Sequence, residues 1–308
     1  MKVSAIIPVY NGELWLSEAL DSIRSQTRPV DELIVVDDAS EDKSAEIATE
    51  FGAKVVRLEK NSGEGAARNA GLRCAIGDAI AWLDADDIWA PNHIEVLCSL
   101  LNQYPEATAA FAAVQRFGLR SELIKGHVPV GPPTNVFWAA FHDWVHTTIG
   151  SMTRRDALLE IGGFDTDQRY AVDYDLWLRL ARDHLFVCTH EITSFWRWHE
   201  EQQSQRYGEQ LQAVYHFRHR YLIEEERSGD PDVARELNKR LAFLFKRDIE
   251  QALASRDIQL ATCLFKISGI VPGLSTANLA RFRLFYYMTR MRALSNRVRS
   301  VLDRSLIF

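Results

Sequence analysis

Cysteine is scarce in this chain of 308 residues, which holds four of them, at Cys74, Cys98, Cys188 and Cys263. The four are widely spaced and form no Cys-x-x-Cys pair. This spacing argues against a structural zinc site and against the framework of a small disulfide-stapled domain. Few, scattered cysteines are typical of proteins from a reducing compartment.

Long apolar runs are missing as well. The segment that comes nearest, residues 258–274, is interrupted by Lys266 and Pro272, whereas a membrane-spanning helix needs about 20 consecutive, mostly apolar residues. A strand-like pattern already begins at Val3, so no signal peptide is predicted. We therefore expect a cytoplasmic protein without a transmembrane segment.

Negative charge dominates most of the chain but is nearly absent from its last part. The net charge is −6, yet residues 277–308 hold seven arginines and a single acid, so this segment carries +6 and the remainder −12. An acidic body argues against nucleic-acid binding. Arginines among aromatic residues are typical either of a helix on an anionic membrane surface or of a helix packed on the acidic body. A peripheral contact with the inner face of the membrane is therefore one of two expectations for residues 277–308.

The first 105 residues alternate between strand-like and helix-like patterns. Strands are predicted at residues 3–9, 32–37, 54–58 and 79–83, and helices at about 13–25, 42–51, 65–75 and 91–103. Such alternation predicts an α/β fold, with a mostly parallel sheet that has helices on both faces. Sheets of this kind bind ligands beyond the carboxyl ends of their strands.

The regular alternation stops near residue 105, and helical patterns dominate from about residue 201. We therefore divide the chain into residues 1–105, residues 106–205 and a helical C-terminal region of residues 206–308. Aromatic side chains are dense in the middle part, which has no simple period.

Asp84 and Asp86 directly follow an apolar run that is expected to be a buried strand. Two carboxylates in such a place are costly unless they are paired or bound to a metal ion. Mg²⁺ or Mn²⁺ would suit them, because these cations take one or two carboxylates together with substrate phosphate oxygens. Alternatively, Asp86 or Asp87 caps the helix that is expected to begin at Pro91.

Two further clusters follow neighbouring strands. Asp37 and Asp38 could accept hydrogen bonds from a base or ribose, although turn formation with Ser40 is favoured by the residues alone. The run from Gly63 to Arg68 is unlike a dinucleotide fingerprint, since an arginine occupies the last position and the run follows the third strand. Its glycines could let the backbone approach a ligand, with Arg68 on a phosphate, or Arg68 could be an ordinary surface arginine.

Two more candidates lie further along the chain. Asp173 opens an amphipathic helix, where it could act as a general base or as an N-cap. His199 follows a cluster of aromatic residues and could be a ligand or a structural histidine.

Taken in order, these segments resemble family 2 glycosyltransferases with the GT-A fold. The segments that carry the resemblance are residues 6–11, 35–42, 61–69, 83–87, 162–165, 173–180 and 196–199. Their order and spacing match as well as their residue types, over about residues 3–205. The resemblance implies a Rossmann-like half that binds a nucleotide-sugar in residues 1–105 and an acceptor-binding and catalytic half in residues 106–205.

The resemblance also implies roles on the donor side. Tyr10 would stack on or flank the nucleotide base, with Pro8 and Asn11 shaping the turn. Asp38 would hydrogen-bond the base, and Arg68 would contact the nucleotide. The donor that we expect is a UDP-sugar.

The remaining roles concern the metal and the reaction. Asp84 would lie by the ribose or the metal, Asp86 would be the principal metal ligand, and His199 would contact the metal or the donor diphosphate. Asp173 would be the catalytic base. Many members of the family carry Glu-Asp where this chain has Val172 and Asp173.

The expected activity is thus a metal-dependent, inverting transfer of a sugar to the hydroxyl of a saccharide or lipid-linked acceptor, in polysaccharide or glycoconjugate biosynthesis. The alternative is an inactive protein that binds nucleotide-sugars or serves as a scaffold, which the retention of all four residues assigned to metal and base argues against. A sugar-phosphate nucleotidyltransferase is a second rival, but its glycine-rich loop should follow the first strand, where this chain has Pro8 to Gly12.

Overall fold

The computed structural model describes residues 1–119, 121–124, 130–142, 147–199, 202, 207–255, 257–269 and 271. The basic segment of residues 277–308 lies outside the described residues, so the two expectations for it stay predictions. The chain divides into two compact units, Met1–Gln205 and Arg206–Phe308.

The described part of the first unit is built on a nine-stranded sheet with the order β3-β2-β1-β4-β8-β6-β9-β5, and β7 pairs with β6. The strands are β1 (Val3–Val9), β2 (Glu32–Asp37), β3 (Lys54–Arg57), β4 (Ala79–Trp82), β5 (Ile88–Trp89), β6 (Ala107–Gly118), β7 (Glu122–Ile124), β8 (Ser151–Arg154) and β9 (Leu185–Trp198). The predicted α/β class with a mostly parallel sheet is confirmed.

The direction of the strands decides where the site lies. β1 pairs in parallel with β2 and β4, and β6 pairs in parallel with β9. Between these two groups, β8 is antiparallel to both β4 and β6. Two reversals cancel, so β6 and β9 run in the same direction as β1 to β4. Their carboxyl ends therefore share one edge of the sheet, which we call the carboxyl edge.

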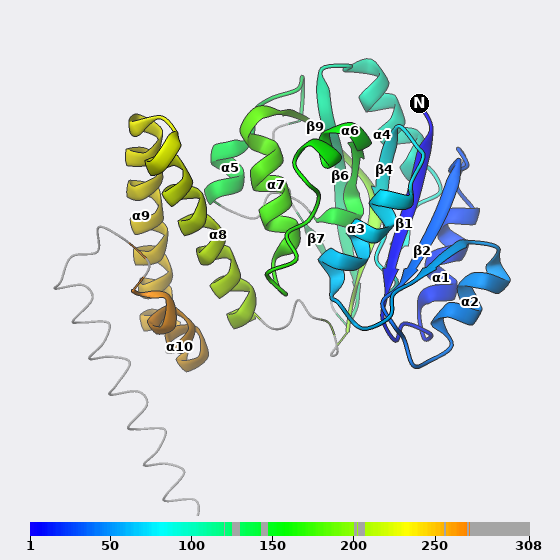
Figure 1. Ribbon diagram of the computed structural model, residues 1–308, viewed down its shortest axis with the longest axis horizontal. Helices are drawn as coiled ribbons and strands as arrows, with labels where there is room; N and C mark the ends of the chain where they lie inside the picture. The colour runs from blue at the N-terminus through cyan, green and yellow to red at the C-terminus, as the bar shows by residue number, and fades with distance from the viewer. Residues whose placement is uncertain are drawn as a thin grey trace, which may run out of the picture. The chain divides into compact units, whose positions relative to one another are not determined.

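The helices of the first unit flank the sheet (Figure 1). They are α1 (Leu16–Arg24), α2 (Ser44–Phe51), α3 (Glu64–Cys74), α4 (His93–Gln103), α5 (Phe137–His142), α6 (Arg155–Glu160) and α7 (Val172–Asp183), with a 3₁₀ turn at Thr148–Gly150. One prediction is wrong in detail: α4 begins at His93 with Asn92 at its cap position, so neither Asp86 nor Asp87 caps it.

Both faces of the sheet are buried. Val3, Ala5 and Ile7 of β1 belong to a core cluster that includes buried residues of α1 and α4. On the opposite face, α3 lies so close to β1 that a Cβ atom added to Gly71 would come within 2.5 Å of the Ile6 Cγ2 atom. Burial on both sides explains why these strands are continuous apolar runs in the sequence.

The second unit is helical in its described part, as predicted. It contains α8 (Tyr207–Ser228), α9 (Pro231–Ser255) and α10 (Ile258–Ile267), and α10 contacts both of the others. In its interior the Tyr215 hydroxyl donates a hydrogen bond of 2.7 Å to Asp248. No helix among the described residues is both long enough and apolar enough to cross a membrane.

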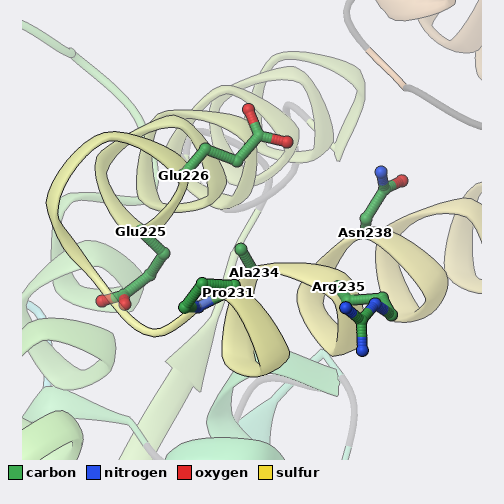
Figure 2. Close-up of a pocket in the computed structure, with 6 residues that line it drawn as sticks. All are labelled: Glu225, Glu226, Pro231, Ala234, Arg235 and Asn238. Atoms are coloured by element: carbon green, nitrogen blue, oxygen red, sulfur yellow. The ribbon is translucent and has the colours of Figure 1, made fainter.

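A depression of about 280 Å³ lies at the turn between α8 and α9 (Figure 2). Its lining residues are Glu225, Glu226, Pro231, Ala234, Arg235 and Asn238. None of the site residues predicted from the sequence belongs to this lining.

Candidate functional site

The loops after β1 and β2 are tied together at the carboxyl edge. The Asn11 main-chain N–H donates to the Ser40 Oγ atom over 2.9 Å, and the Asn11 side-chain oxygen accepts from the Glu41 N–H over 2.9 Å. Pro8 is buried within β1. Tyr10 is 49% exposed, so its ring stands at the edge, open to a ligand.

The two acids at the end of β2 have different partners. Asp37 accepts from the Ser40 N–H and pairs with Arg57, so the turn that the sequence favoured is formed by this residue. Asp38 is 3% exposed, and its two oxygens accept from the N–H groups of Ser62 and Gly63 over 2.7 and 2.8 Å. Asp38 therefore holds the loop that leads into α3.

Arg68 is a deeply buried charge, with 1% of its surface exposed. Its guanidinium pairs with Glu64 one turn earlier in α3 and with Asp84 at 2.6 Å, and it lies over the Phe164 ring. The alternative of a surface arginine is thus wrong. Burial opposes the charged form, but Glu64, Asp84 and Asp173 outweigh it and raise the pKa of Arg68.

Asp84 and Asp173 are two carboxyl groups whose pKa values are raised by burial and by nearby charges. Burial, together with the charges of Glu64 and Asp86, raises the pKa of Asp84 to about 6 against the opposing effect of Arg68. Burial and then Glu64 raise the pKa of Asp173 to about 7, again against Arg68. The charge of Asp84 also raises the pKa of Asp173, which places Asp173 of α7 in the same cluster as residues of α3 and of the loop after β4.

Asp173 does not cap its helix. The cap position of α7 is Ala171, and no side chain accepts a hydrogen bond there. The Asp173 Oδ1 atom accepts only from the adjacent Tyr174 N–H, over 2.8 Å, among the hydrogen bonds of the described residues. Asp175 differs, because it is buried and paired with Arg179 at 2.7 Å. The N-cap alternative for Asp173 is therefore wrong.

Asp86 and His199 are 113 residues apart in the sequence but adjacent in the structure. The Asp86 Oδ2 atom lies 2.9 Å from the His199 Nε2 atom, and the two side chains are 30% and 23% exposed. The described residues contain no group of three His, Cys, Asp or Glu side chains that could hold a metal ion. A carboxylate with an imidazole nevertheless fits a cation such as Mn²⁺ that completes its coordination with phosphate oxygens and water.

Three further residues contribute to the site through contacts that the sequence did not predict. Asp87 is 1% exposed and accepts from the Arg197 N–H over 2.7 Å. Burial, followed by the charges of Asp86 and Asp84, holds its pKa well above the usual range. Glu64 could have been suspected from its i,i+4 spacing to Arg68. The contacts of Arg197 with the loop after β4 had no local signal, because the partners are far apart in sequence.

Backbone strain is concentrated at the same edge. The non-glycine residues with positive φ in the described part of the chain are Asn11, Ala39 and Ala171, at 51°, 62° and 54°. Each lies within two residues of a predicted site residue. Left-handed conformations of such residues cost free energy and often accompany functional sites.

Comparisons with known proteins point to one family. The family model described as glycosyl transferase family 2 matches residues 4–162. An uncharacterized glycosyltransferase of Bacillus subtilis is 37% identical over 191 residues, which cover 60% of this chain and 69% of that protein. One of Rickettsia typhi is 32% identical over 209 residues, or 65% of each chain. The match thus spans just under two thirds of the Rickettsia protein.

Solved structures resemble the fold. S. aureus TarS 1–349 in complex with UDP-GlcNAc has a TM-score of 0.71 at 17% identity, over 96% of this chain and 92% of that one. The mannosyltransferase PcManGT from Pyrobaculum calidifontis, in complex with GDP-Man and Mn²⁺, has a TM-score of 0.61 at 19% identity, over 94% and 84%. At these identities the likeness concerns the fold alone, and it confirms the predicted GT-A-type architecture with C-terminal helices.

Proposed function

The chain belongs to glycosyl transferase family 2, and from this premise we propose that it transfers a sugar from a nucleotide-diphosphate sugar to an acceptor hydroxyl. The observation that supports this most is the convergence of Asp84, Asp86, Asp173 and His199 at the carboxyl edge, where Asp86 and His199 come together from 113 residues apart. An open α/β sheet binds its ligand at this edge.

The donor is a UDP-sugar held at the ends of β1 and β2. Tyr10 flanks the base, which its half-exposed ring allows. Asp38 keeps accepting capacity for a base N–H, since each carboxylate oxygen has two lone pairs and accepts one backbone N–H in the structure. Pro8 and Asn11 shape the turn, and Arg68 adds positive charge beneath the nucleotide.

Asp86 and His199 would hold Mg²⁺ or Mn²⁺, with Asp84 beside them. When bound, such a cation neutralises the charge that develops on the leaving diphosphate. The residues of the chain do the remaining electrostatic work. Arg68 keeps Asp84 in place through their 2.6 Å ion pair, so the carboxylate nearest the nucleotide does not turn away from the site.

Asp173 is the base. One of its carboxylate oxygens takes the proton of the acceptor hydroxyl, whose oxygen forms the new bond to the anomeric carbon. The bond from that carbon to the diphosphate oxygen breaks, and the nucleoside diphosphate leaves with the electron pair. A single displacement of this kind inverts the anomeric configuration. A pKa of about 7 suits a general base at neutral pH.

The acceptor is a saccharide or a lipid-linked saccharide, in polysaccharide or glycoconjugate biosynthesis. Residues 1–105 bind the donor, residues 106–205 bind the acceptor and carry the base, and residues 206–308 form the helical extension. A peripheral contact of residues 277–308 with the cytoplasmic face of a membrane would bring the enzyme to a lipid-linked acceptor. Flotation of the full chain with anionic vesicles tests this point. A chain that does not bind these vesicles contradicts it.

A thermal-shift screen tests the proposed function. The protein is heated with UDP-, GDP- and dTDP-sugars, each with Mn²⁺ or with EDTA. A donor at about 100 times its Kd stabilises the fold by about 2.7 kcal/mol, and release of nucleoside diphosphate is then measured with that donor. If no nucleotide-sugar raises the melting temperature with Mn²⁺, the proposal is wrong. Binding without turnover across saccharide and lipid-linked acceptors favours the scaffold alternative.

A further inference from the structure

Arg197, at the end of β9, lies over two aromatic rings. Its guanidinium carbon lies 4.2 Å from the centre of the Trp15 ring and 4.6 Å from that of the Phe117 ring. The residue is 9% exposed. A guanidinium that is buried against two aromatic rings has little freedom to move, and its N–H groups must find hydrogen-bond acceptors close by.

The N–H groups of that guanidinium bind the loop after β4 and a side chain of α1. The Arg197 Nε atom donates to the Asp86 carbonyl oxygen over 2.8 Å, and Nη2 donates to the Glu18 carboxylate over 2.7 Å. The main chain of the same residue contributes as well, since the Arg197 N–H donates to the Asp87 carboxylate over 2.7 Å. The loop of residues 84–87 and the end of β9 are thus joined by two hydrogen bonds, both donated by Arg197.

This fastening sets the position of His199. The histidine follows Arg197 by two residues, and its Nε2 atom lies within hydrogen-bond distance of the Asp86 carboxylate. Arg197 binds the main-chain carbonyl oxygen of the same aspartate. Trp15 contacts both residues, with its ring centre 6.2 Å from that of His199. A shift of the β9 end relative to the loop would separate Asp86 from His199, because no covalent connection shorter than 113 residues joins them.

We propose that Arg197 is a positioning residue, which fixes Asp86 and His199 in the one relative geometry that binds a divalent cation on a nucleoside diphosphate. This inference rests on the proposed function. Arg197 acts through Asp86 and His199 and does not touch the substrate.

Arg116 offers a matched control on the neighbouring strand. Its guanidinium carbon also lies over two rings, 4.7 Å from the centre of Trp196 and 4.4 Å from that of Trp198, and it pairs with Glu122 at 2.8 Å. It therefore resembles Arg197 in its aromatic contacts and charge, but its partners are Trp196, Trp198 and Glu122 and not the loop of residues 84–87.

The test compares Arg197→Met, Arg197→Lys, Glu18→Gln and Arg116→Met with the wild type. Titration calorimetry measures Mn²⁺ binding to the UDP-saturated protein, and UDP binding in EDTA is measured separately. Melting temperatures without ligand report folding. Arg197→Met should weaken Mn²⁺ binding by about tenfold to a hundredfold, as expected when a partner that orients a metal ligand is lost. Metal-free UDP binding should stay within about twofold of the wild type, because Arg197 makes no hydrogen bond to Tyr10, Asn11 or Asp38 in the described part of the chain.

The other variants separate positioning from general stability. Arg197→Lys should restore part of the affinity, since the amine can still reach one of the two acceptors, and Glu18→Gln should cost about threefold. Arg116→Met should leave Mn²⁺ binding within about twofold of the wild type. Equal losses in Arg116→Met and Arg197→Met overturn the inference, as does wild-type affinity in a folded Arg197→Met. Should Arg197→Met not fold, wild-type affinity in Glu18→Gln overturns it.

Failure of the proposed function gives a different result. In that case the wild type itself binds Mn²⁺ with neither UDP nor GDP, whatever the state of Arg197. If the wild type binds Mn²⁺ in the presence of GDP but not of UDP, the same titrations are carried out with GDP, and the same outcomes support or overturn the inference.

Discussion

Replacing Asp173 with asparagine should abolish turnover and stabilise the fold. The pKa of this carboxyl rises from 3.8 to about 7 in the folded protein, chiefly through burial and then through Glu64. Its charged form is therefore disfavoured by folding, and that penalty amounts to about 4 kcal/mol above pH 7. Asparagine has nearly the same shape and keeps an oxygen for the Tyr174 N–H, but it carries no charge.

The pH dependence gives this prediction its sign. Between about pH 4 and pH 7 the folded protein binds a proton at Asp173 that the unfolded chain has lost. The free energy of unfolding of the wild type therefore decreases as the pH rises through this window. The asparagine variant does not lose this stability, because its side chain does not titrate. The variant should exceed the wild type by up to about 4 kcal/mol at pH 8 and by only about 1.5 kcal/mol at pH 5.

Urea unfolding at the two pH values measures the stability, and release of nucleoside diphosphate measures the turnover. Turnover should drop by about a hundredfold to ten-thousandfold, the range for loss of a general base, while donor binding persists. Asp175→Asn on the same helix is the control, since breaking its buried pair with Arg179 should destabilise the protein at pH 8. A variant of Asp173 that is less stable than the wild type at pH 8, or fully active, would refute the reasoning.

Three other changes test the remaining parts of the site and fold. Glu64→Gln removes the charge that contributes most to the raised pKa of Asp173, so the acid limb of the kcat/KM profile should move to lower pH by about one unit; an unmoved limb contradicts this. EDTA should abolish turnover and added Mn²⁺ restore it, and Asp86→Ala or His199→Ala should raise the Mn²⁺ concentration needed for half-maximal activity. Gly71→Ala should lower the free energy of unfolding by about 1–3 kcal/mol, because the new methyl group overlaps β1; urea unfolding measures it, and a stability equal to wild type would show that α3 can move away.

The buried pairs also explain why some residues could be selected from the sequence and the surroundings of others could not be foreseen. Asp86 and Asp173 could be selected as candidates because acids at a strand end and at a helix start are visible in a short window of sequence, and their roles stay predictions. For Arg68 the sequence allowed two interpretations, an exposed surface arginine or a contact to a phosphate. Its burial is a property of the tertiary structure, in which Glu64 and Asp84 pair with it. Asp87 was interpreted as a possible cap, although its partner is the main chain of Arg197, 110 residues later.

The sequence by itself determined the alternation of strands and helices, the positions of the loops at the carboxyl edge and the types of side chain that those loops carry. These properties depend on local periodicity and on turn residues, whose preferences act over a few positions. It also determined the family, because an ordered set of short motifs survives in the linear chain. Helix boundaries were accurate to within a few residues for the same local reason.

Tertiary structure alone decided which of the polar side chains meet. The antiparallel insertion of β8 aligns β6 and β9 with β1 to β4, and this alignment brings His199 to Asp86. The pKa values of Asp84 and Asp173 likewise depend on burial and on charges from other elements. Both effects arise from contacts between different elements of the fold or from the exclusion of water, and neither can be deduced from a local sequence pattern.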